Sequence, residues 1–173
     1  MNILLKTTMA LAVGLLAETA TAAVLPLKIG WSELRSEQPG DAAGKPDETL
    51  SAGLEGQVVE LKGYLLPVDR EGDLVYEFLL VPWAGACSHM AQPPPNQVVH
   101  VFPENPYRAS ASYEPVEISG TMRLGLETTQ LFIMDGVVVV ESGYRVGRAK
   151  VMKTDNAGLA PVRKSNPWSF ITK

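Results

Sequence analysis

The most reactive side chains of this 173-residue chain are few, and two of them lie close together. The sequence holds one cysteine and two histidines, and the segment 85–97, GACSHMAQPPPNQ, contains Cys87 and His89. In an extended backbone, residues i and i+2 lie on the same face with Cα atoms about 6.5–7 Å apart. A thiolate and an imidazole on one face can converge on a zinc or copper ion. The same pair can also form a thiolate–imidazolium nucleophile or redox centre.

The residues around this pair are suited to shaping a loop. Glycine leaves the backbone approachable, and three consecutive prolines favour a stiff polyproline II path. The amides that follow can hydrogen-bond the loop. We therefore expect a supporting role for six residues: Gly85, Pro93, Pro94, Pro95, Asn96 and Gln97.

A complete metal site requires more ligands than this pair. His100 is the other imidazole and lies on the following expected strand, so we include it as a metal ligand with Cys87 and His89. One cysteine and two histidines exclude a closed Cys₄ or Cys₂His₂ zinc centre. The prediction is an open, partial site for zinc, with copper as the alternative. In the alternative reading, Cys87 is a small buried apolar residue and His89 satisfies a backbone carbonyl group.

Recognisable catalytic motifs are absent from the sequence. It has no G-x-S-x-G elbow, phosphate-binding glycine loop, dinucleotide fingerprint or H-E-x-x-H. We therefore predict no catalytic residues and favour a non-enzymatic protein. Two alternatives remain open: a thiol enzyme with Cys87 as nucleophile and His89 as base, and an interaction module that docks through the proline run.

The composition is that of one folded domain. Hydrophobic residues make up 46% of the chain and charged residues 20%, which is too apolar for a disordered protein. The net charge is −4 and no strong Lys/Arg cluster is present. Because phosphate recognition requires a basic surface, nucleic acid is not an expected partner.

The N-terminus has the pattern of a cleavable signal peptide. One basic residue, Lys6, precedes an apolar run from Thr7 to Ala17, and Ala20-Thr21-Ala22 has the small-x-small form of a cleavage site. The apolar run is too short to span a bilayer. No cysteine lies near the cleavage point, so the protein is not expected to be a lipoprotein. We predict secretion through a cleavable signal peptide, with no stable membrane span after processing.

The remainder of the chain is rich in patterns of short strands. Alternating or continuous apolar runs, separated by turn residues, occur at 57–68, 75–83, 97–102, 115–125 and 130–153. They predict a mainly β fold, a small antiparallel five- to six-stranded OB-like barrel, with an irregular β-sandwich as the alternative. The expected organisation is a signal peptide (1–22), an N-terminal segment and loop (23–55), the β-barrel domain (56–153) and a C-terminal tail (154–173).

Several of these motifs together resemble a known family. They are a Trp-x-x-Leu near the expected mature start, Gly63-Tyr64 followed by Pro67, FLLVP at 78–82, GAC-x-H at 85–89, and PPPNQ at 93–97. This set resembles the secreted bacterial family called domain of unknown function 3299, over Trp31 to about Val151. The resemblance implies a periplasmic protein with an accessory role beside an ABC-type transporter or another envelope protein, in some members linked to zinc supply. It implies no established activity.

The chain departs from the family pattern at two places. Met90-Ala91-Gln92 separates His89 from the prolines, whereas the family passes almost directly from histidine to proline. Family members often carry an aromatic residue at the position of His100, so the resemblance does not support His100 as a ligand. The resemblance does favour a functional role for the Cys87/His89 loop, with metal contact ahead of thiol chemistry.

Overall fold

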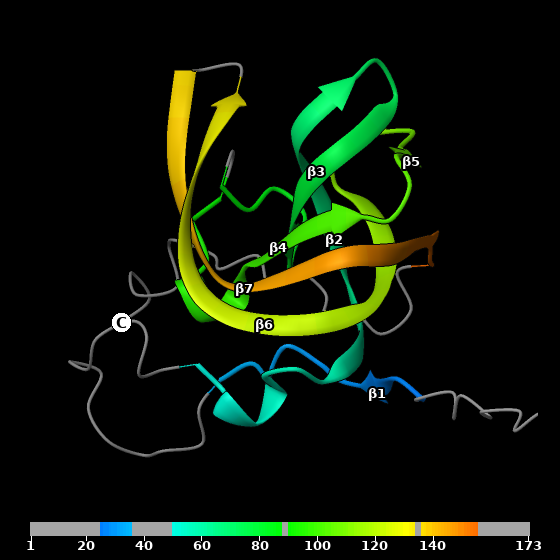
Figure 1. Cartoon of the computed structure of the whole chain (residues 1–173). Coiled ribbons are helices and arrows are strands. Elements are labelled where there is room, and N and C mark those ends of the chain that lie inside the picture. Colours follow the sequence, from blue (N-terminus) through cyan, green and yellow to red (C-terminus); the bar gives the residue numbers. More distant parts are fainter. Residues whose placement is uncertain (1–24, 36–49, 88–89, 134–135, 156–173) are drawn as a thin grey trace, which may run out of the picture.

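The computed structural model describes residues 25–35, 50–87, 90–133 and 136–155 (Figure 1). The expected signal peptide, most of the loop before residue 50, His89 and nearly all of the C-terminal tail lie outside the described residues. Among the helices of the described part, none has the length and apolar character needed to cross a membrane.

The described chain is mainly β, as predicted. Its strands are β1 (Leu27–Lys28), β2 (Val58–Glu71), β3 (Leu74–Val81), β4 (Val99–Pro103), β5 (Tyr107–Arg108), β6 (Glu114–Ile133) and β7 (Gly136–Lys153). Two single-turn 3₁₀ helices, η2 (Ala52–Leu54) and η3 (Pro95–Gln97), lie between them. The predicted strand patterns at 57–68, 75–83, 97–102 and 115–125 correspond to β2, β3, β4 and the first part of β6. The pattern at 130–153 corresponds to the end of β6 together with β7.

The strands form one seven-stranded sheet in the order β1-β2-β6-β7-β4-β3-β5. An additional pairing of β2 with β3 closes five of them, β2, β6, β7, β4 and β3, into a ring (Figure 1). The expectation of a purely antiparallel sheet is wrong, because β4 runs parallel to β7 and β1 runs parallel to β2. Antiparallel neighbours alternate in direction, so a ring with an odd number of strands must contain at least one parallel pair.

Alternation along the strands divides the apolar side chains between two cores. Phe78 and Leu80 of β3 point into the ring, where the main core gathers, whereas Leu79 and Val81 point outward. The outward residues belong to a second core on the outer face of β2 and β3. Its buried members are Leu66, Leu79, Val81, Ala86, Cys87, Val98, Leu131 and Val140.

The long strands β6 and β7 continue past the ring as a two-stranded hairpin (Figure 1). We call residues 126–133 and 136–142 the β6–β7 arm. Leu131 and Val140 on its inner face are buried in the second core. The arm therefore covers part of the outer face of β2 and β3.

The N-terminal segment is attached to the ring by its Trp-x-x-Leu motif. Leu34 is fully buried, and the Tyr144 hydroxyl donates a 2.5 Å hydrogen bond to its carbonyl. Trp31 Nε1 donates to the Lys62 carbonyl at 2.8 Å. A Cβ atom at Gly63 would lie 2.8 Å from Trp31 Cζ2. Gly63 is thus required for the close approach of the indole.

Candidate binding face

The Cys87 loop turns tightly at the end of β3. Gly85 and Cys87 both have left-handed backbone conformations, with φ of +85° and +67°. The Met90 amide donates to the Gly85 carbonyl at 3.0 Å, and the Tyr113 hydroxyl donates to the Ala86 carbonyl. Cys87 is therefore not extended, so the spacing argument that placed it on one face with His89 fails at this residue. Because His89 lies outside the described residues, their pairing stays a prediction.

The Cys87 thiol is in an apolar environment. Its residue is 5% exposed and packs in the second core with aliphatic residues such as Leu79 and Val98. Burial raises the pKa of the thiol to about 11. Because the thiolate is both the nucleophile and the metal ligand, a thiol that stays protonated at neutral pH is poorly suited to either role.

The proline run and the amide after it brace the ring from outside. The Gln97 and Val98 amides donate to the Pro94 and Pro95 carbonyls at 2.8 and 3.1 Å, which forms η3. A Cβ atom at Gly143 of β7 would lie 2.9 Å from the Pro95 carbonyl oxygen, so this packing requires glycine. The run thus packs directly against β7.

The Gln97 side chain links this loop to the N-terminal segment. It is almost completely buried, and its Nε2 donates to the Trp31 carbonyl and to the Asn96 carbonyl, both at 2.8 Å. Arg35 Nη2 donates to Gln97 Oε1 at 3.5 Å. The side chain predicted to support the loop therefore also fixes the Trp-x-x-Leu segment.

His100 lies on the same outer face and contacts two carboxylates. It lies on β4 opposite Leu79 of β3, two residues after Val98, which precedes β4. Its Nε2 lies 2.6 Å from Glu77 Oε1 of β3, and its Nδ1 lies 2.9 Å from Glu127 Oε2 of β6. Both ring nitrogens can donate to a carboxylate only when the imidazole is protonated. Metal binding through His100 would first require one of these hydrogen bonds to break.

A cation and an aromatic ring extend the cluster. Arg145 Nη1 on β7 donates to Glu127 Oε1 at 3.2 Å, and the Arg145 Cζ lies 4.4 Å from the centroid of the Phe102 ring. The rings of Phe102 and His100 are 4.5 Å apart between centroids. Strands β3, β4, β6 and β7 therefore each contribute to one connected group. We call Glu77, His100, Phe102, Glu127 and Arg145 the His100 cluster.

The carboxylates of this cluster are accessible from outside. The side chains of Glu77 and Glu127 are 27% and 35% exposed, whereas His100 is 8% exposed. We call the His100 cluster together with the described part of the neighbouring loop, residues 85–87 and 90–97, the binding face. In that loop Met90, Ala91, Gln92 and Pro94 are exposed.

Two of the predicted metal ligands, Cys87 and His100, have different chemical surroundings. His100 shares the outer face with Cys87, but its ring nitrogens contact Glu77 and Glu127. Within residues 25–35, 50–87, 90–133 and 136–155, no group of three or more His, Cys, Asp and Glu side chains is arranged to hold a metal ion. The metal site of Cys87, His89 and His100 stays a prediction.

The carboxylates and the guanidinium of the His100 cluster were not among the predicted site residues. One signal was present in the sequence, because Glu77 is an acidic residue inside an otherwise apolar strand pattern, whereas Glu127 lies between two of the patterns. A buried or half-buried charge in such a strand usually has a partner. The sequence does not give the strand register, so it could not reveal that His100 was this partner.

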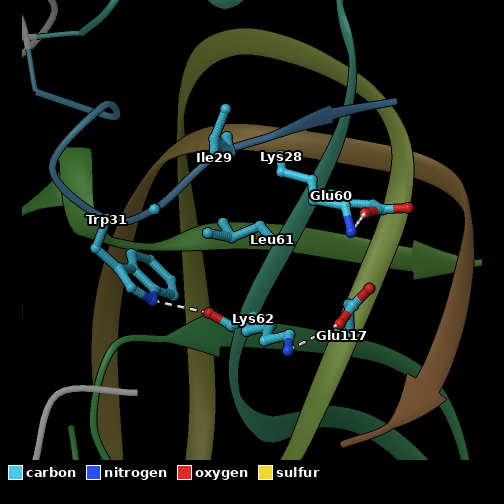
Figure 2. A pocket seen from close by; sticks show the side chains of 8 residues that line it. Lys28, Ile29, Trp31, Glu60, Leu61, Lys62 and Glu117 are labelled. Carbon is cyan, nitrogen blue, oxygen red and sulfur yellow. Dashed lines mark hydrogen bonds and ion pairs between the residues drawn. The ribbon is translucent and has the colours of Figure 1, made fainter. Parts of the chain in front are cut away.

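A half-open pocket of about 210 Å³ lies elsewhere, where β1 leaves β2 (Figure 2). The Trp31 indole lies at one end, and Lys28–Glu60 and Lys62–Glu117 ion pairs of 3.5 and 3.4 Å lie at the other. Its charged side chains are already paired with one another. The pocket is lined by the N-terminal segment, β2 and β6, and it shares no residue with the binding face.

Comparison with known proteins gives one family. The family model described as "Protein of unknown function (DUF3299)" matches residues 28–153. The crystal structure of a DUF3299 family protein from Pseudomonas aeruginosa PAO1 is similar, with a TM-score of 0.58 and 26% sequence identity over 76% of this chain and 97% of that chain. No curated protein matches the chain significantly.

Proposed function

Because this chain belongs to the DUF3299 family, whose description assigns no activity, we propose a function from the chemistry of its surface. The protein is a non-catalytic binding module of the cell envelope, exported to the periplasm by its N-terminal signal. It contacts a partner protein through the binding face. The partner is an ABC-type transporter or another envelope protein, a choice motivated by the family resemblance.

The observation that carries this proposal is the connected set of polar and charged side chains on the outer face. His100 is held between Glu77 and Glu127, and Arg145 is held by Glu127 and Phe102. Each charged side chain is therefore fixed before a partner arrives, which lowers the entropy lost on binding. Partly exposed carboxylates and a half-exposed guanidinium at this position give electrostatic specificity to a protein contact.

The order of the ring strands supports an OB-like arrangement, which we propose as the finer description of the fold. If the five ring strands are numbered 1 to 5 in chain order (β2, β3, β4, β6 and β7), their order around the ring is 1-4-5-3-2, with strand 2 pairing back to strand 1. In OB folds the face of the second and third strands and the flanking hairpin loops bind ligands. Here these two strands are β3 and β4, which carry Glu77 and His100.

The environment of Cys87 favours binding over thiol catalysis. Its buried thiol has a pKa raised to about 11, whereas catalytic thiols have lowered values. A zinc or copper site at Cys87 would have to deprotonate this thiol against the cost of desolvation. Partner binding requires no such ionisation, so we place it ahead of metal binding and of a thiol enzyme.

Site-specific photo-crosslinking in cells tests the proposal. A photoreactive phenylalanine analogue at Gln92, which is exposed in the binding face, should give a discrete adduct with an envelope protein. The same analogue at Lys28, exposed on β1 away from this face, is the control. The proposal is wrong if Gln92 gives no adduct, or if both positions give the same adducts in the same yield.

A further inference from the structure

The outer edge of the β6–β7 arm is open. Between Val137 and Glu141, β7 pairs with β6 on one side, and its pairing with β4 begins only at Tyr144. Along 137–141, no strand of the described chain pairs with the other edge. An edge strand presents unpaired backbone N–H and C=O groups that can pair with another strand.

The sequence of this edge favours strand pairing. It consists of four consecutive valines, Val137 to Val140, followed by Glu141. Valine has a high β propensity. Natural edge strands are usually protected by charged side chains, proline or a β-bulge. Residues 137–140 contain no charge and no proline and show no register shift with β6, and the one charge of the segment, Glu141, lies at its end.

The outer face of the arm carries three exposed apolar side chains along this open edge, next to the polar Gln130 and Thr128. Val137 and Val139 are 54% and 53% exposed, and Phe132, directly opposite Val137 on β6, is 82% exposed. Contiguous exposed apolar side chains at an open edge are typical of an interaction site. The arm therefore combines unpaired backbone with an uncovered apolar surface.

We propose that this edge pairs with the same edge of a second copy of the chain. The pairing is antiparallel and centred on Val139, so that Val139 lies opposite Val139 of the second copy and Glu141 lies opposite Val137. This is the self-complementary contact of a two-fold dimer. In this register, Val137 and Val139 of both copies lie on the same face of the sheet that the two arms form together.

The charges are compatible with this register. The two Glu141 side chains lie at opposite ends of the contact, about 13 Å apart along the strands at about 3.3 Å per residue. A register centred on Glu141 would instead place two carboxylates directly opposite each other, which is destabilising. A five-residue strand contact is smaller than a standard interface, so the dimer is reversible and depends on protein concentration.

Cysteine crosslinking tests the pairing and its register. In the mature protein with Cys87→Ala, Val139→Cys should form a disulfide-linked dimer under mild oxidation, because directly opposite residues have adjacent Cβ atoms. Val137→Cys should form much less disulfide-linked dimer, because residue 137 faces Glu141 of the second copy in this register. Equal crosslinking at the two positions, or none at either, would overturn the proposal.

Sedimentation of proteins without introduced cysteines provides an independent test. Val139→Lys should raise the dimer dissociation constant at least about tenfold. Met152→Lys is the matched control, because Met152 is equally exposed on β7 but lies outside the arm. A protein that stays monomeric up to about 0.5 mM, or variants that weaken dimerisation equally, would contradict the pairing.

Discussion

The imidazole of His100 joins two carboxylates that are 50 residues apart in the sequence, with Nε2 2.6 Å from Glu77 and Nδ1 2.9 Å from Glu127. This bridge ties the β6–β7 arm to β3 and β4. It also fixes the charges that we propose a partner protein recognises.

Replacing His100 with leucine should lower the free energy of unfolding by about 2–4 kcal/mol, because it leaves two half-buried carboxylates without their shared donor. Urea denaturation measures the change. Adding Glu77→Gln and Glu127→Gln to His100→Leu should recover part of the loss. Arg148→Ala, on an exposed side chain of β7, is the control and should change stability by less than about 0.5 kcal/mol.

The Cys87 thiol should be inert in the folded protein. Burial raises its pKa to about 11, so alkylation by iodoacetamide near pH 8 should be at least about 100-fold slower than in the unfolded chain. Mass spectrometry of the native and urea-unfolded protein compares the two rates. Rapid alkylation of the native protein would revive the thiol-enzyme alternative.

The same thiol predicts a dependence of stability on alkaline pH. Its folded pKa is raised above the ordinary value of 9.0, so above pH 9 the unfolded chain releases its proton first. The contribution of this thiol to the free energy of unfolding is therefore fully present below pH 9, and it is lost as the pH rises from 9 to 11. Denaturation of the wild type and Cys87→Ala between pH 8 and 11 should give a shallower decline for the variant.

Glu114, at the start of β6, predicts a dependence on acidic pH. Burial alone would raise its pKa, but hydrogen bonds from Ser110 and Tyr107 and the charge of Lys153 outweigh burial and lower the pKa to about 2. Tyr107 donates to it at 2.6 Å and the Ser110 amide at 2.9 Å.

A lowered folded pKa stabilises the protein above the ordinary value of 4.5, and this contribution is lost as the pH falls from 4.5 to 2. Its size is on the order of 3 kcal/mol. Glu114→Gln should be less stable at pH 7 and should lose less stability on acidification than the wild type. If both proteins lose the same unfolding free energy between pH 7 and pH 2, Glu114 does not cause this pH dependence.

The contacts of Gln97 and Gly143 predict how the N-terminal segment is held. Gln97→Ala removes the donor to the Trp31 carbonyl and should cost about 1–3 kcal/mol. Gly143→Ala places a Cβ atom 2.9 Å from the Pro95 carbonyl oxygen and should also destabilise the protein. Hydrogen exchange should then increase at Trp31 to Leu34 in both variants, and unchanged exchange in this segment would contradict the assignment.

The strands could be predicted from the sequence because their patterns are local. Alternation at 57–66 and the apolar run at 75–81 each match the period of a buried or half-buried strand, and both are strands. The parallel pairing of β4 with β7 could not be predicted in this way, because it depends on how many strands close the ring.

The candidate site was less predictable for a similar reason. Gln97 and the proline run stand out in the sequence, and Gln97 contacts Trp31 of the same motif set, whereas Pro95 packs on Gly143 outside it. The His100 cluster depends on a register shift between Leu124 and Glu127 of β6, which sets where Glu127 lies relative to His100. A shift of one residue would move Glu127 to the other face of the sheet.

The central claim, that the binding face recognises a partner through its fixed charges, is tested most directly by reversing one charge and measuring crosslinking. With the photoreactive residue at Gln92, Arg145→Glu should reduce the adduct yield in cells at least about tenfold, while Lys28→Glu leaves it unchanged. Equal adduct yields from Arg145→Glu and Lys28→Glu, at equal protein levels, would contradict the claim.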